Sequence, residues 1–167
     1  MRHLIYITLC LFGLATTAQS TILINNVVIF NGKDEKTITG NVLVVNNLIQ
    51  KISTSPIPTN KSGNTVIIDG KGKFLMPGLI DAHWHAILTA STMNELMYAE
   101  PGYVFIKAGD EAANTLMRGF TSVRDLGGPS FGLKKAIDDG VIDGPRIWPS
   151  GSIISQTSGH GDFRSVN

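Results

Sequence analysis

The sequence predicts an α/β fold in which a small β-rich segment precedes a longer segment of alternating strands and helices. Two observations support this prediction. Residues 21–76 contain short, β-branched apolar runs separated by turn residues, a pattern typical of a small β-sandwich. From Pro77 onward, strand-like and helix-like runs alternate, which indicates βαβ units around a parallel sheet.

The order of elements after Pro77 fits the opening of a (β/α)₈ barrel. A complete barrel of this kind takes about 250 residues, whereas residues 77–167 number 91. We therefore expect residues 77–167 to hold the first three of eight barrel strands, as a truncated barrel. Because an open sheet leaves an unpaired edge, the 167-residue chain on its own is expected to be unstable or insoluble.

Residues 1–18 are expected to be a signal peptide. Arg2 provides a basic start, an apolar run follows, and small residues lead to a cleavage site after Ala18. The apolar run is shorter than the roughly 20 residues that a membrane-spanning helix needs. We therefore predict an exported protein, periplasmic or secreted, with no membrane attachment after cleavage. The single cysteine, Cys10, lies in this leader, so the mature chain is predicted to lack disulfides and thiolate ligands.

Residues 19–76 are expected to form the β-sandwich segment. Its predicted strands are residues 21–30, interrupted at Asn25-Asn26, a hairpin over 41–52 and a strand over 65–68. Asn46-Asn47 would supply the hairpin turn, and the prolines and glycine of residues 53–64 indicate a loop. Taken alone, this segment has few apolar residues for a core.

Residues 77–167 are expected to alternate between strands and helices. The predicted elements are a strand ending near His85, helices over 89–99 and 103–118, a strand over 121–125, a helix over 130–139 and a strand over 146–150. Gly119 and Gly140 follow two of the helices in the position that favours glycine. The helix over 103–118 is expected to bury a stripe with helical spacing, formed by Phe105, Ala108, Ala112 and Leu116 with Ile106, Ala113 and Met117.

The residues with the clearest chemistry are His83 and His85, at the end of the first strand after Pro77. Side chains at i and i+2 of a strand point to the same side, about 6.5 Å apart at the Cα atoms, so two imidazoles can share one metal ion. Neutral imidazole suits Zn, Cu, Fe and Ni. Asp81 precedes His83 by two residues and would support it through a hydrogen bond. An isolated His-x-His is more often a pair of ordinary surface or core histidines. The residues around the pair must therefore show whether it binds metal.

The setting is the stretch Pro77-Gly78-Leu79-Ile80-Asp81-Ala82-His83-Trp84-His85, with an apolar strand after a Pro-Gly turn. It resembles the first barrel strand of the metal-dependent amidohydrolase superfamily. The resemblance implies that His83 and His85 bind the more buried metal of a site with one or two divalent ions, Zn²⁺ foremost. It also implies that the remaining ligands and the general base come from later strands, so no catalytic residue is assigned in this chain.

Further side chains follow the second and third predicted strands. His160 lies in Ser158-Gly159-His160-Gly161-Asp162, which resembles a substrate-contact loop in the imidazolonepropionase-like and Xaa-Pro dipeptidase-like branch, so His160 is predicted to bind substrate. An ordinary loop histidine is the alternative. Asp125 ends the second strand and would orient the loop that follows or a metal ligand, and the alternative is a carboxylate that only caps a turn. Trp84 is expected to pack against the outer helices, and Trp148 to lie in the core or barrel wall.

The resemblance implies that the complete protein is a metal-dependent hydrolase that cleaves a C–N bond through a metal-activated water, with the active site incomplete in this chain. The substrate would be an amide or an Xaa-Pro-type dipeptide, with a cyclic amide or a deaminase substrate as the second choice. The alternative is a truncated, non-catalytic remnant that binds metal weakly. A formal net charge of +1, without a cluster of lysines and arginines, gives no reason to expect nucleic acid as a partner. The oligomeric state is left open.

Overall fold

The computed structural model describes residues 20–60 and 64–162 and divides the chain into two compact units, Met1–Pro77 and Gly78–Asn167. The predicted signal peptide, residues 1–18, lies outside the described residues. Among the residues that are described, no helix combines the length and apolar character needed to cross a membrane.

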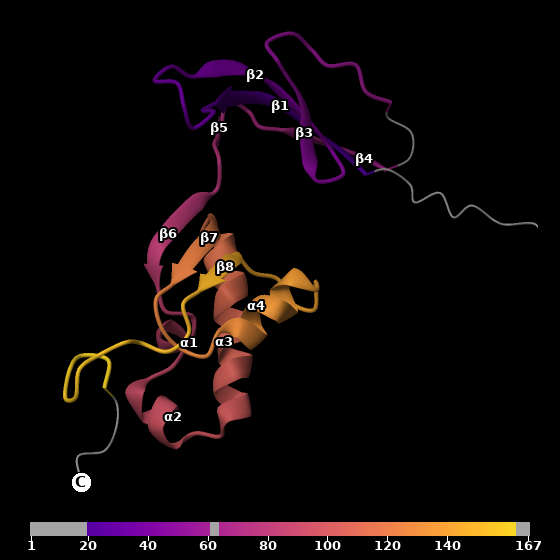
Figure 1. The fold of residues 1–167 in the computed structure, drawn as a ribbon. Helices are drawn as coiled ribbons and strands as arrows, with labels where there is room; N and C mark the ends of the chain where they lie inside the picture. Colours follow the sequence, from indigo (N-terminus) through magenta and orange to yellow (C-terminus); the bar gives the residue numbers. More distant parts are fainter. Residues whose placement is uncertain (1–19, 61–63, 163–167) are drawn as a thin grey trace, which may run out of the picture. The chain divides into compact units, whose positions relative to one another are not determined.

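The first unit contains one five-stranded mixed sheet (Figure 1). Its strands are β1 (Thr21–Ile29), β2 (Ile38–Val45), β3 (Leu48–Ser53), β4 (Thr65–Asp69) and β5 (Phe74–Leu75). They are arranged in the order β3-β2-β1-β4, and β5 also pairs with β1. The pairs β1–β2 and β2–β3 are antiparallel, whereas β4 and β5 run parallel to β1.

Local signals of the sequence explain the turns of this sheet. Asn46, at the predicted hairpin turn, has a φ of 55°, a left-handed conformation that asparagine tolerates better than most residues. Asn26 has the same φ, and the β1–β2 register shifts between Ile24 and Val27, so the interruption predicted at Asn25-Asn26 is a β-bulge. The strands predicted from apolar runs are confirmed, because β1, β2, β3 and β4 overlap the predicted ranges.

The described residues of this unit form one sheet, not the two facing sheets of a sandwich. The buried cluster is small and consists of Val27, Ile29 and Val42, with Ile24, Val44 and Leu75 packed against it. Large apolar side chains of β3 and β4 stay exposed, among them Leu48, Ile49 and Val66. This distribution leaves much of the apolar surface of the sheet without a partner inside the described unit.

The second unit is built on a parallel sheet with the strand order β6-β7-β8. Its strands are β6 (Leu79–Trp84), β7 (Phe120–Asp125) and β8 (Arg146–Pro149), and its helices are α1 (Ala86–Ala90), α2 (Met93–Tyr98), α3 (Pro101–Met117) and α4 (Phe131–Asp138). The alternation predicted after Pro77 is therefore confirmed. The single helix predicted over 89–99 is two helices, because Thr92 caps a new helix start with its side chain.

Helices α3 and α4 lie on the same side of β7 and β8 (Figure 1). The core between them contains the fully buried Val123 and Ile147 from the strands and Ala108 and Ala112 from α3. Trp84, 5% exposed, packs in this cluster, which confirms that its side chain turns toward the helices. Gly119 ends α3 with a φ of 95°, a left-handed conformation that glycine adopts without steric cost.

The predicted burial was wrong at several positions. The buried face of α3 is formed by Val104, Ala108, Ala112 and Thr115, whereas Phe105, Ile106 and Met117 are exposed. Helix α3 faces the sheet with the small side chains of Ala108 and Ala112. Phe105 lies outside this buried face. Trp148 is 52% exposed, because it lies on the face of β8 opposite the buried Ile147.

Candidate metal centre

His83 and His85 lie together at the carboxyl end of β6. Their ring centroids are 5.2 Å apart, and the ring planes meet at 75°, edge to face. His83 is still in the strand, and His85 is the residue at which the chain turns into α1. The Nδ1 atom of His85 is buried and makes no hydrogen bond with any described residue. The pair therefore presents two neighbouring imidazoles, one of which has a nitrogen left over for a further partner.

The donor set of the described residues is incomplete for a catalytic metal. A catalytic zinc usually has three protein ligands, and the part of the chain that the structure describes contains no group of three His, Cys, Asp or Glu side chains placed to hold a metal ion. The chemistry of the two imidazoles fits zinc, and the 5.2 Å ring separation fits neighbouring ligands. His83 and His85 thus fit part of a metal site.

Asp81 supports the main chain at this site. Its Oδ1 accepts a hydrogen bond of 2.9 Å from the backbone N–H of His83. The sequence suggested a bond to an imidazole, whereas the observed bond fixes the path of the strand just before the histidine ring. Arg124 adds a second tie, because its Nε donates to the carbonyl oxygen of Ala82 at 2.8 Å.

Asp125 is fully buried where β7 ends. Its Oδ1 accepts a hydrogen bond of 3.1 Å from the backbone N–H of Gly127, while its Oδ2 is buried and accepts none from the described residues. Main-chain bonds join the three strand exits here: Leu126 N–H donates to the Trp84 carbonyl at 3.0 Å, and Ser150 N–H donates to the Asp125 carbonyl at 2.9 Å. Asp125 thus lies where the ends of β6, β7 and β8 meet.

His160 is exposed in the segment that follows β8. This segment is folded back by a turn in which Ser158 has a φ of 58° and its N–H donates to Oδ2 of Asp162 at 2.9 Å. It is tied to the β7 exit loop through Gly151, whose carbonyl accepts from the Gly128 N–H at 3.0 Å. The structure therefore brings the His160 segment to the same edge of the sheet as His83 and His85.

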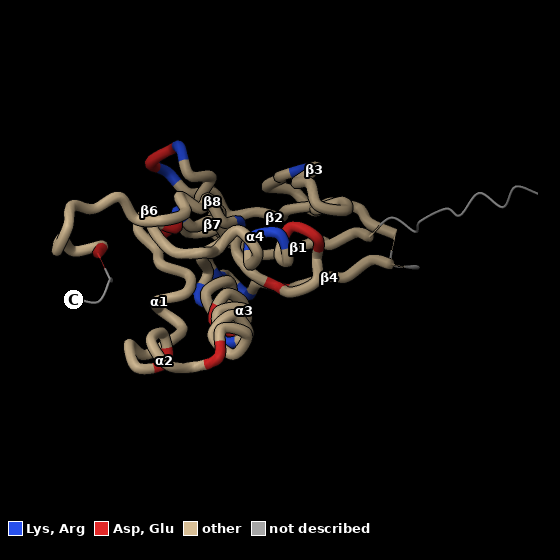
Figure 2. The backbone as a smooth tube through the Cα atoms, turned by 60° about the horizontal axis from the view of Figure 1, so that its bottom comes forward, with Lys and Arg blue, Asp and Glu red and all other residues tan. Residues whose placement is uncertain are grey.

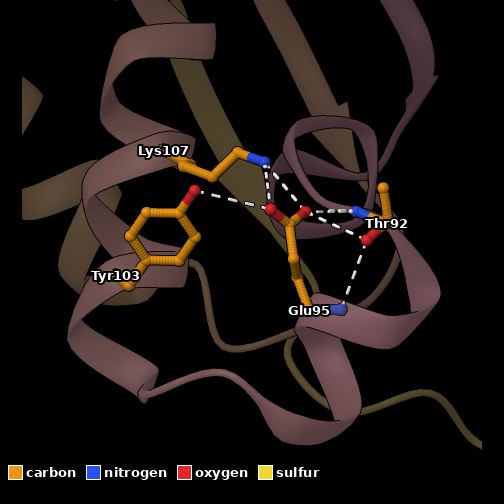
Figure 3. Close-up of polar contacts among 4 residues, drawn as sticks. All are labelled: Thr92, Glu95, Tyr103 and Lys107. Carbon is orange, nitrogen blue, oxygen red and sulfur yellow. Dashed lines mark hydrogen bonds and ion pairs between the residues drawn. The ribbon is translucent and has the colours of Figure 1, made fainter.

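A polar cluster joins α2 to α3, and the sequence analysis missed it (Figure 3). The Glu95 carboxylate accepts hydrogen bonds from Lys107 Nζ at 2.8 and 2.9 Å and from the Thr92 backbone at 2.8 Å. These bonds lower the pKa of Glu95 from 4.5 to about 2. The bond from Lys107 has the largest effect, and the bond from the Thr92 backbone has the second largest. The same contact raises the pKa of Lys107. Thr92-Met93-Asn94-Glu95 is a capping-box pattern that was available in the sequence.

The charges of the described residues are mixed in sign. Figure 2 shows basic and acidic residues interspersed along both units. Several of the described charges are paired locally, including Lys134 with Asp138 at 2.5 Å and Lys135 with Asp139 at 2.6 Å on α4. Such i,i+4 pairs are ordinary features of an exposed helix face.

Comparison with known families gives a match for most of the second unit. The model of the amidohydrolase family matches residues 74–166. Ochratoxinase of Aspergillus niger is 38% identical over 92 residues, which are 53% of this chain and 19% of that protein. Imidazolonepropionase of Treponema denticola is 35% identical over 74 residues, 44% of this chain and 18% of that protein. The chain thus spans about a fifth of the length of these relatives.

Solved structures match over both units. A prolidase in complex with N-methylphosphonate-L-proline has a TM-score of 0.74 and 34% identity, and the match covers 87% of this chain and 35% of that one. A Xaa-Pro dipeptidase with methionine bound in the active site has a TM-score of 0.72 and 26% identity, covering 88% of this chain and 38% of that one. The two sheets of this chain, one mixed and one parallel, correspond to a portion of these structures.

Proposed function

Since the chain belongs to the amidohydrolase family, we propose that the complete protein is a metal-dependent hydrolase of a C–N bond. The observation that carries the proposal is the pair of neighbouring imidazoles, with ring centroids 5.2 Å apart, at the end of the first parallel strand. Active sites of α/β barrels lie at the carboxyl ends of the strands, which is where His83 and His85 lie.

The complete protein, in this proposal, closes the parallel sheet into a (β/α)₈ barrel of which residues 77–167 form the first three strands. Support comes from the strand order β6-β7-β8 and from the sheet face opposite the helices, where Arg124, Arg146 and Trp148 are exposed. In a closed barrel this face turns inward. Residues 19–76 would be one part of a β-sandwich that further strands complete, which would cover the exposed apolar residues of β3 and β4.

His83 and His85 would hold the metal, one or two divalent ions with Zn²⁺ foremost, together with ligands from later strands. A bound ion of this kind supplies an activated water and polarises the carbonyl of the scissile bond. Asp81 keeps the main chain of His83 in place, and Asp125 would orient the metal-bound histidines through its unpaired Oδ2. His160, on the neighbouring exit loop, would contact the substrate.

For the substrate we propose an amide, a cyclic amide or an Xaa-Pro-type dipeptide. The prolidase and the Xaa-Pro dipeptidase among the similar structures favour the dipeptide. A cyclic substrate or a deamination is the second choice. It is supported by two relatives, the imidazolonepropionase and the 5'-deoxyadenosine deaminase of Methanobrevibacter smithii. The leader-like residues 1–18 support export to the periplasm or the medium.

Metal analysis of the complete protein tests the proposal. We expect the His83→Ala and His85→Ala variants to lose most of the bound zinc and the hydrolysis of Xaa-Pro dipeptides. The His160→Ala variant is the matched control, because it should retain zinc and lose only affinity for substrate. Full metal occupancy in the His83→Ala, His85→Ala double variant would refute the assignment. Zinc bound by these histidines without hydrolysis of any amide would favour the non-catalytic remnant.

A further inference from the structure

The second unit contains an apolar cavity of about 500 Å³. Helices α1, α2 and α3 supply most of its lining, and the segments after β7 and β8 supply the rest. The lining residues that matter for the argument are Ile87, Met93, Leu96, Met97, Phe105 and Ile153. Met93, Met97 and Phe105 are 60%, 54% and 41% exposed, so these apolar groups reach open space instead of a packed core. The volume lies in the range of about 300–1,000 Å³ that is typical of small-molecule sites.

The cavity lies at the end of the sheet where His83 and His85 lie. Ile87 and Leu88 line it directly after the histidines, Gly127 and Gly128 line it from the β7 exit, and Ile153 and Gly161 from the segment after β8. All three strands of the parallel sheet therefore contribute their exits to its wall. His160, immediately before Gly161, is exposed beside it.

Two glycines fix this part of the wall. A Cβ atom added at Gly127 would stand 2.3 Å from Ile153 Cγ1, and one added at Gly161 would stand 2.2 Å from Ile153 Cγ2. The Ile153 side chain thus fills the space that larger residues on either loop would need. Because the Ile153 side chain packs against both glycines, the His160 segment is held against the β7 exit, where Ile153 and Gly161 line the cavity.

We propose that this cavity is the subsite for a large aliphatic or aromatic side chain of the substrate, next to the C–N bond that is cleaved. The inference rests on the proposed function, which places the reacting bond at the histidine pair. Apolar walls select by size and apolar character, and the flexible side chains of Met93 and Met97 adapt to different shapes. The preferred substrate is therefore an amide or dipeptide whose residue on one side of the bond resembles leucine, methionine or phenylalanine.

The alternative occupant is a later part of the chain that covers the cavity as core. The lining favours substrate, because exit loops of consecutive parallel strands contribute to it and ligands of α/β folds bind outside the carboxyl ends of the strands.

A substrate series on the complete, zinc-loaded protein tests the inference. The series consists of Gly-Pro, Ala-Pro, Leu-Pro and Phe-Pro, and we expect kcat/KM to rise about tenfold or more from the smallest to the largest residue. The Phe105→Ala variant should flatten the series by about tenfold, because Phe105 lines the cavity. Ile106→Ala is the matched control: Ile106 is the next residue on α3, is 74% exposed and does not line the cavity, so the series should stay as in the wild type.

A binding measurement separates failure of the inference from failure of the proposed function. In protein labelled with ¹³C-methyl methionine, N-acetyl-leucine amide should shift the methyl signals of Met93 and Met97 but not that of Met117, and N-acetyl-glycine amide should shift none. These shifts without hydrolysis would support the cavity as a binding site and overturn the hydrolase. Hydrolysis with a flat substrate series and unmoved methyl signals would overturn the subsite and leave the hydrolase in place.

Discussion

Substitution of Asp125 tests whether this buried carboxylate serves the fold or the metal site. The carboxylate is fully buried, with Oδ1 bonded to the Gly127 N–H and Oδ2 without a partner among the described residues. Asp125→Ala removes the acceptor of the Gly127 N–H. Since a buried donor left without an acceptor costs about 1–3 kcal/mol, the free energy of unfolding should fall by about that amount.

Asp125→Asn should behave differently. The amide keeps an oxygen within reach of the Gly127 N–H, and it removes a buried negative charge that has one oxygen unpaired. The weaker neutral bond and the removed desolvation cost nearly offset each other, so we expect a change in stability of about 1 kcal/mol or less. If Oδ2 orients a metal-bound histidine, however, zinc affinity should fall about 10- to 100-fold, as is usual when such a partner is lost.

The two variants are compared by urea denaturation and by zinc competition against a chelating dye, on the complete protein. Asp138→Asn on the exposed face of α4 is the control and should change neither quantity by much. Wild-type zinc affinity in Asp125→Asn would refute a role of this carboxylate toward the metal. Wild-type stability in Asp125→Ala would refute the energetic reasoning from the Gly127 bond.

Three further predictions concern the second unit. The lowered pKa of Glu95, about 2, means that its contribution to stability is present above about pH 4.5 and lost as the pH falls toward 2, so the difference in urea midpoint between wild type and Glu95→Gln should disappear over that window. Ile147→Ala should cost about 2–5 kcal/mol in unfolding free energy, whereas Val141→Ala, at a 72% exposed position, should change it by about 0.5 kcal/mol or less. Gly119→Ala, at a φ of 95°, should cost about 1 kcal/mol or more in the same denaturation assay, and an unchanged midpoint would contradict the left-handed helix end.

Strand and helix positions could be predicted where apolar spacing and turn residues agree. The hairpin turn at Asn46 and the helix end at Gly119 were predicted correctly, because asparagine and glycine tolerate left-handed backbone angles that most residues avoid. Burial was harder to predict. Phe105 is more apolar than Ala108, yet the alanine lies in the core because its small size lets α3 approach the sheet. Apolar character alone does not show which side of a helix makes the closest contact.

For the candidate site, only the placement of the side chains can be compared with the prediction. The spacing of His83 and His85 predicted rings on one side of the chain, and the rings do lie 5.2 Å apart, while the metal itself stays a prediction. The contact between Glu95 and Lys107 could not be predicted, since the two residues are 12 positions apart and meet only when α2 folds back along α3. The cavity was missed for the same reason, because its walls come from segments brought together by the parallel sheet.

The bonds that connect the strand exits use main-chain atoms, as in the pair formed by the Gly128 N–H and the Gly151 carbonyl. Such bonds do not depend on which side chains the loops carry. Descendants of one ancestral gene can therefore exchange cavity residues on these segments, such as Ser152 and Ile153, while the segments keep their course. If the cavity binds substrate as proposed, divergence of this kind would change the substrate preference and leave the two histidines where they are.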